Sequence, residues 1–131
     1  MQTVVLALAT GAIFLVLDAL MLTYFMQPLF SRHIGPQLAD PIRLGPAIAF
    51  YLLFIGGLMY FVSLPALANG TSALIPALLF GLVAYGTYEL TSYAVMRDWH
   101  ISMVLADMGW GAVLAALSAT GGLAITRAIG H

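Results

Sequence analysis

The sequence has no cysteine and no lysine, and charge of either sign is scarce. Its 131 residues are 63% hydrophobic and only 7% charged, whereas about a quarter of the residues in soluble domains are charged. Without cysteine the chain can form no disulfide and offers no thiolate ligand or nucleophile. A surface so poor in charge would expose large apolar patches to water. We therefore expect lipid to cover most of it, and the net charge of −1 provides no basic face for nucleic acid.

Four apolar segments are long enough to cross a membrane as helices, which takes about 20 residues each. They are residues 3–30, 45–64, 73–96 and 101–126. The first segment has no basic residue before it and is longer than the ~7–15 residues of a signal-peptide core, so we expect it to be retained. Turn-forming residues separate the segments, with Asp40–Pro41 in the first connection and Pro65 in the second. The sequence predicts one all-α domain over residues 1–131, an integral membrane four-helix bundle.

The arginines beside the spans predict the orientation of the bundle. Arg32 and Arg43 fall in the first connection and Arg97 in the third, whereas Arg127 lies on the opposite side of the membrane. Basic residues accumulate in cytoplasmic connections. We therefore expect the first and third connections in the cytoplasm and both termini outside.

Three acidic residues, Asp18, Glu89 and Asp107, lie inside the predicted spans. A charged residue at the centre of a membrane helix costs about 2.5–3.5 kcal/mol on insertion scales. No basic residue lies inside a span to neutralise these acids. Acids in this position are by default expected to form a buried site, functional or structural.

Counting from the helix ends places most of the polar residues at one depth. Glu89, Asp107, Tyr51 and Trp110 share a layer in the half of the membrane nearest the first connection, because each helical residue rises about 1.5 Å. Asp18 lies about one to two turns deeper. Small residues on the fourth helix let neighbouring backbones approach closely, which favours an inward orientation of the acids. The donors expected to reach the carboxylates are Tyr51, Tyr85, Tyr88 and Trp110.

Two carboxyl groups in one low-dielectric layer without a cation should not both ionise, so we expect at least one to be neutral. The site would then be a proton or cation site, or a hydrogen-bonded network that specifies the packing. His33, His100 and His131 lie in connections or at the terminus without metal-ligand spacing, so we expect no metal and no cofactor. Trp99 is interpreted as an interfacial aromatic residue.

The third and fourth helices carry a longer pattern. It consists of residues 85–93 (YGTYELTSY), then Asp98–Trp99, then residues 107–111 (DMGWG). This pattern resembles the bacterial membrane-protein family catalogued as domain of unknown function 2177. Asp18 and residues 49–51 (AFY) fit the same pattern, so the resemblance covers essentially the whole chain. It implies four helices and a multi-pass protein of the bacterial inner membrane, with both termini in the periplasm on our orientation, and it implies no activity.

Three functions remain open. The first is an accessory subunit or lipid-binding membrane element, whose partners would be lipid, other membrane subunits or a second copy. The second is a small proton-coupled transporter that uses Glu89 and Asp107. The third is an enzyme of lipid modification, which we rank last because the chain lacks the many histidines of di-metal membrane enzymes. These functions predict different features: a continuous water route to Glu89 for the transporter, a lateral opening to the carboxylates for the enzyme, and an outward stripe of small residues for the subunit.

Overall fold

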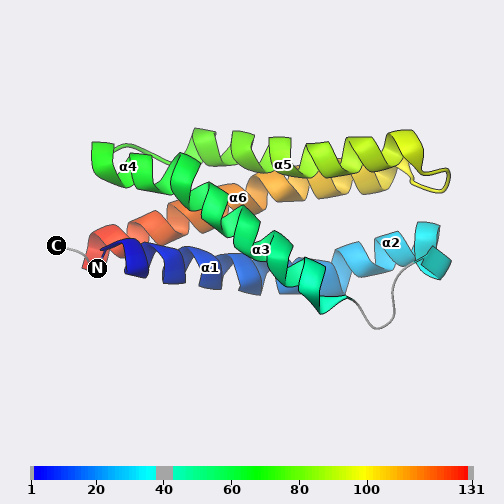
Figure 1. Ribbon diagram of the computed structural model, residues 1–131, viewed down its shortest axis with the longest axis horizontal. Helices are drawn as coiled ribbons and strands as arrows, with labels where there is room; N and C mark the ends of the chain where they lie inside the picture. The colour runs from blue at the N-terminus through cyan, green and yellow to red at the C-terminus, as the bar shows by residue number, and fades with distance from the viewer. Residues whose placement is uncertain (1, 38–42, 130–131) are drawn as a thin grey trace.

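A computed structural model describes residues 2–37 and 43–129 of the chain, and all of its regular elements in those ranges are helical. The described residues form four long helical rods, which can be followed in Figure 1. The first rod comprises α1 (Gln2–Met21), a π-helical segment (Leu22–Met26), α2 (Gln27–Ile34) and a 3-10 turn (Gly35–Gln37). The second comprises α3 (Leu44–Leu58), a π-helical segment (Met59–Ser63) and α4 (Leu64–Asn69), and the last two are α5 (Leu74–Val95) and α6 (Ile101–Ile129). All four rods are long and apolar enough to cross a membrane, which confirms the predicted all-α membrane bundle.

The second helix continues through Pro65, so the assignment of this residue to a connection is wrong. Pro65 lies in the first turn of α4, directly after a π-helical segment, and Pro28 has the same position in α2. Proline removes one N–H donor and its ring crowds the preceding turn. A wider turn just before the ring can relieve that crowding, which allows both helices to continue. The second connection begins instead at Gly70, whose left-handed φ of 66° ends α4.

Helix α6 is the centre of the bundle, with α1 and α5 packed along it. Small residues on α6 make this close packing possible. A Cβ atom added to Gly81 of α5 would lie 2.8 Å from the carbonyl carbon of Gly111 and 2.8 Å from the Cβ of Ala115. A Cβ added to Gly122 would lie 3.0 Å from the backbone nitrogen of Thr10. The predicted stripe of small residues therefore allows close backbone contact within the bundle.

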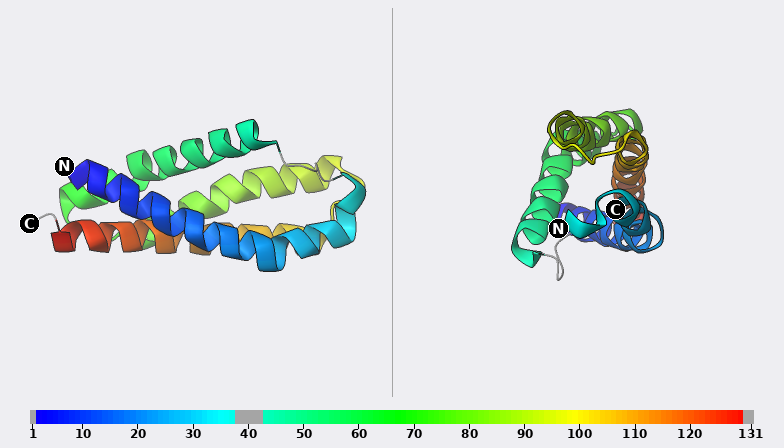
Figure 2. Two further views of the ribbon diagram at one scale, coloured as in Figure 1. Left: turned by 90° about the horizontal axis from the view of Figure 1, so that it is seen from below. Right: turned by 90° about the vertical axis from the view of Figure 1, so that its right-hand side faces the viewer.

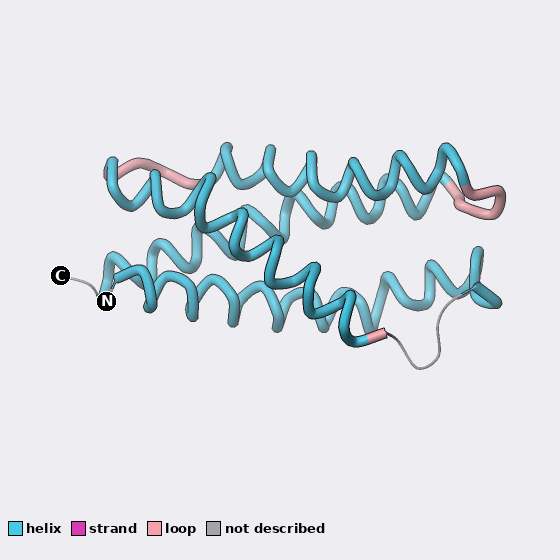
Figure 3. Tube along the Cα trace, in the orientation of Figure 1, coloured by secondary structure: helices cyan, strands magenta, loops and turns pink. Residues whose placement is uncertain are grey.

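Helix α3 crosses the bundle obliquely (Figure 1), and its N-terminal half stands away from the other helices in the left view of Figure 2. The beginning of α1 and the end of α6 lie at one end of the bundle, and α2 and the α5–α6 connection lie at the other (Figure 1). Short non-helical segments join α4 to α5 and α5 to α6 (Figure 3). Asp40–Pro41 and His131, which we assigned to the first connection and to the terminus, lie outside the described residues.

Candidate functional site

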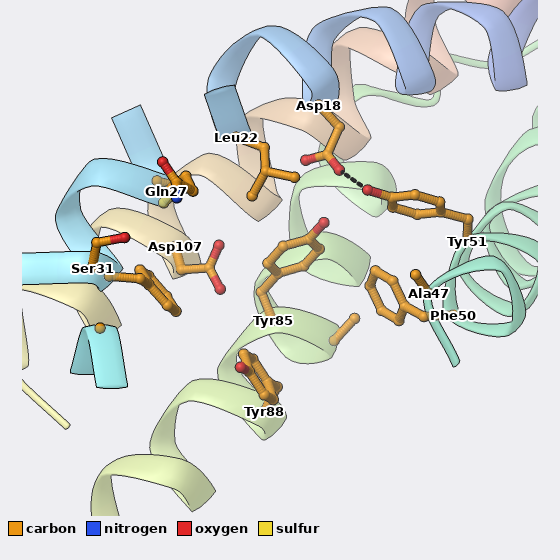
Figure 4. Close-up of a pocket in the computed structure, with 14 residues that line it drawn as sticks. Asp18, Leu22, Gln27, Ser31, Ala47, Phe50, Tyr51, Tyr85, Tyr88 and Asp107 are labelled. Carbon is orange, nitrogen blue, oxygen red and sulfur yellow. Dashed lines mark hydrogen bonds between the residues drawn. The ribbon is translucent and has the colours of Figure 1, made fainter. Parts of the chain in front are cut away.

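A cavity of about 890 Å³ lies among α2, the start of α3 and the C-terminal half of α5. Side chains from all four membrane-spanning rods line it, and Figure 4 shows acidic and aromatic groups pointing into it. Most of its wall is aliphatic or aromatic. Its lining residues are Asp18, Leu22, Met26, Gln27, Phe30, Ser31, Gly35, Ala47, Phe50, Tyr51, Ala84, Tyr85, Tyr88 and Asp107.

Asp18 is held on the cavity wall by donors from two other helices. The hydroxyl of Tyr51 on α3 donates to its Oδ2 at 2.7 Å, as Figure 4 also shows. The indole Nε1 of Trp110 on α6 donates to its Oδ1 at 3.3 Å. Both predicted donors therefore reach Asp18 and not Glu89 or Asp107.

Glu89 lies on α5 and is completely buried, with 0% of its surface exposed. Its Oε1 accepts a hydrogen bond of 2.9 Å from the indole of Trp99. The side chain of Trp99 is only 7% exposed, so its ring is a buried donor within the bundle. The α5–α6 connection folds the indole back onto α5, and the ring packs edge-on against Phe30 and Tyr88. The feature of the sequence that marks Trp99 is its position in the pattern over residues 85–111, which resembles a known family.

Asp107 lies on α6 between Glu89 and the cavity. Its side chain is 9% exposed and lines the cavity, whereas Glu89 does not line it. Asp107 and Glu89 are close neighbours and form an acid pair, and Glu89 Oε2 has no hydrogen-bond partner within the described part of the chain. Ionised carboxylates accept hydrogen bonds but cannot donate them, so two carboxyl groups bond to each other only when one carries a proton. That at least one of the two acids is neutral stays a prediction.

The two remaining tyrosines of the predicted site occupy different environments. Tyr85 is buried, with its ring over Gly111 and edge-on to Phe54. In Figure 4 it lies between Asp18 and Asp107. Tyr88 is 52% exposed at the edge of the cavity. Among the described residues neither hydroxyl donates to Glu89 or Asp107, contrary to expectation, because Trp99 occupies the donor position beside Glu89.

A separate cluster joins α2 to the start of α6. The imidazole rings of His33 and His100 stack with centroids 4.3 Å apart and an interplanar angle of 9°. Ser102 Oγ lies 2.8 Å from His100 Nδ1 and 3.4 Å from His33 Nε2. His33 lies in α2 and not in the first connection as expected, and it is thus a neighbour of His100 in the α5–α6 connection. Residues 2–37 and 43–129 hold no group of three or more histidine or acidic side chains suited to a metal ion.

The comparisons with known proteins identify a family. No curated protein and no solved structure matches the chain. The sequence profile of a family described as predicted membrane protein (DUF2177) matches residues 3–124, which is nearly the full length. The match includes every residue of the cavity and of the acid pair. The chain therefore belongs to the DUF2177 family of predicted membrane proteins.

Proposed function

We propose that the protein is a membrane element that binds a lipid or a similar amphiphile in the cavity, alone or as an accessory subunit of a larger assembly. The observation that supports this proposal is the cavity itself. It has about 890 Å³ of space, an apolar wall and two carboxyl groups within it. Pockets for small ligands usually measure about 300–1,000 Å³ and combine an apolar lining with a few polar groups.

The position of the cavity favours a ligand that arrives from the bilayer. All of its lining residues except Gly35 belong to the four candidate spans. Three of them, Leu22, Phe50 and Tyr88, are 44%, 42% and 52% exposed on the outer surface of the bundle. Because lipid is the solvent around these side chains, an acyl tail can approach the cavity laterally between α2 and α3.

A small proton-coupled transporter is the second candidate, and the proximity of the two acids Glu89 and Asp107 favours it. Such a transporter needs water to reach the acids from both sides of the membrane. Glu89 is fully buried and only Asp107 of the pair faces the cavity, which favours binding over transport. An enzyme of lipid modification remains the third candidate function. Only one acid of the pair, Asp107, lines the cavity, so a catalytic site would have a single acid of this pair in contact with the lipid.

Residue Ala47 offers a direct test because its side chain lines the cavity, whereas Ala49, two residues further along α3, is exposed. Ala47→Trp should fill part of the cavity, and Ala49→Trp should place the same ring in lipid. A photoactivatable lipid should label the wild type and Ala49→Trp, with the label mapped by mass spectrometry to α2, α3 or α5. Ala47→Trp should lose most of that label. Equal labelling of both variants would contradict binding in the cavity.

We further propose that the protein lies in the bacterial inner membrane with both termini in the periplasm. The bias of three arginines against one supports this orientation. Reporters fused after residue 131 and inserted between Arg32 and Arg43 should respond on opposite sides, periplasmic and cytoplasmic respectively. The reverse result would overturn the orientation, and two reporters on one side would contradict the four-span topology.

A further inference from the structure

The cavity has acidic groups and no basic side chain of its own among the described residues. Asp18 and Asp107 line it, and Glu89 is completely buried beside Asp107. The sequence has no lysine, and none of the described residues that line the cavity is an arginine or a histidine. Charges buried in a low-dielectric region are costly unless an opposite charge lies close to them.

None of the four arginines is among the residues that line the cavity. Arg32, Arg43 and Arg97 are exposed near the first and third connections. Arg127 donates at 3.0 Å and 2.7 Å to backbone carbonyls near the α4–α5 turn, at the other end of the bundle. A cation that offsets the acids must therefore come with the ligand or from solution.

The geometry around Asp107 supports the same conclusion independently of the charge count. Its side chain is 9% exposed and points into the cavity (Figure 4). Tyr51 and Trp110 donate to Asp18 and Trp99 donates to Glu89, so the acceptor positions of Asp107 that face the cavity are available to a ligand. Tyr85 lies between Asp107 and Asp18, and the rings of Phe50 and Tyr88 also line the cavity. Aromatic faces beside carboxylates suit an organic ammonium group, which gains both cation–π and ionic contacts.

We propose that the amphiphile bound here carries an ammonium head group, which contacts Asp107 and Asp18 from the cavity side of Tyr85 while its tail follows the apolar wall. This inference rests on the proposed lipid-binding function. It assigns the ligand to membrane lipids with a terminal amine, because the approach to the cavity is from the bilayer. A lipid whose head group is only anionic finds no basic partner on the described cavity wall. A bare metal ion would leave the large apolar volume unfilled.

A pair of ligands with one tail and different heads tests the charge directly. The full-length protein in mild detergent is labelled with the photoactivatable lipid, and dodecylamine or dodecanol is added as competitor. Dodecylamine should compete at least about tenfold more strongly than dodecanol, since a favourable ionic contact easily supplies that ratio. Asp107→Asn should reduce the ratio to near one while dodecanol still competes. Should Asp107→Asn fail to fold, Asp18→Asn serves as the second variant and should lower the ratio in the same direction.

The outcomes separate the two proposals. Equal competition by the amine and the alcohol would overturn the ammonium head group and leave lipid binding intact. Absence of competition by either would refute the proposed function itself. Protein reconstituted in nanodiscs with equal amounts of phosphatidylethanolamine and phosphatidylglycerol should retain phosphatidylethanolamine on transfer to detergent. Retention of phosphatidylglycerol would overturn the assignment to amine-bearing membrane lipids.

Discussion

Replacing Gly81 with alanine perturbs the contact that holds α5 against α6. The added Cβ would lie 2.8 Å from both the carbonyl carbon of Gly111 and the Cβ of Ala115. Carbon atoms normally approach to about 3.5–4.0 Å, so the helices must separate by roughly 0.7 Å or more. Overpacking of this kind costs about 1–3 kcal/mol. The gain in helix propensity offsets about 0.5–1 kcal/mol of that, and the expected net loss is about 1–2 kcal/mol of unfolding free energy.

Gly109 provides the matched control, because a Cβ added there meets nothing within 4 Å. Gly109→Ala should keep or raise the stability by about 0.5–1 kcal/mol. Titration of both variants with sodium dodecyl sulfate in mixed micelles, followed by tryptophan fluorescence, gives the two free energies. Gly81→Ala should also weaken labelling by the photoactivatable lipid, since the α5–α6 contact positions Glu89 and Asp107. If Gly81→Ala were as stable as Gly109→Ala, the close backbone packing of α5 against α6 would be refuted.

The polar contacts within the bundle lead to further expected outcomes. Trp99→Phe removes the donor to buried Glu89 and should cost about 1.5–3 kcal/mol in the same titration, and an unchanged stability would contradict that hydrogen bond. Infrared spectra near neutral pH should show a carboxylic-acid band that the double variant Glu89→Gln/Asp107→Asn lacks, whereas full ionisation of both acids in the wild type would exclude the shared proton. Arg127→Gln removes two hydrogen bonds to carbonyls near the α4–α5 turn and should lower the stability by about 1–3 kcal/mol, with Arg127→Lys in between.

The acids were recognisable from the sequence because the bilayer makes them exceptional. Asp18, Glu89 and Asp107 interrupt runs of apolar residues, and any acid in such a run needs a partner or a proton. Their partners were harder to predict. Helical depth placed Tyr51 and Trp110 in the layer of Glu89 and Asp107, but the rotation of each helix turned both donors toward Asp18. Depth follows from counting residues along one helix, whereas rotation depends on how the helices pack.

Trp99 shows the same limit at a connection. Its position near a helix end is typical of an interfacial residue, and nothing local indicates that the connection folds the ring onto Glu89. Pro65 is the opposite case. Proline is a strong local signal for a turn, but a π-helical segment before Pro65 lets the helix continue. In both cases a contact or a distortion outside the usual local pattern overrode the sequence signal.

The sequence by itself determined that this protein is a four-span membrane bundle with acids inside it. Lipid offers no hydrogen bonds, so long apolar segments must be helical and buried acids must be exceptional. Only the tertiary structure decided that Asp18 pairs with Tyr51 and Trp110, that Trp99 donates to Glu89, and that a cavity opens beside Asp18 and Asp107. These features depend on the rotation and tilt of α3, α5 and α6, which arise from contacts between residues distant in the sequence, such as Gly81 against Gly111.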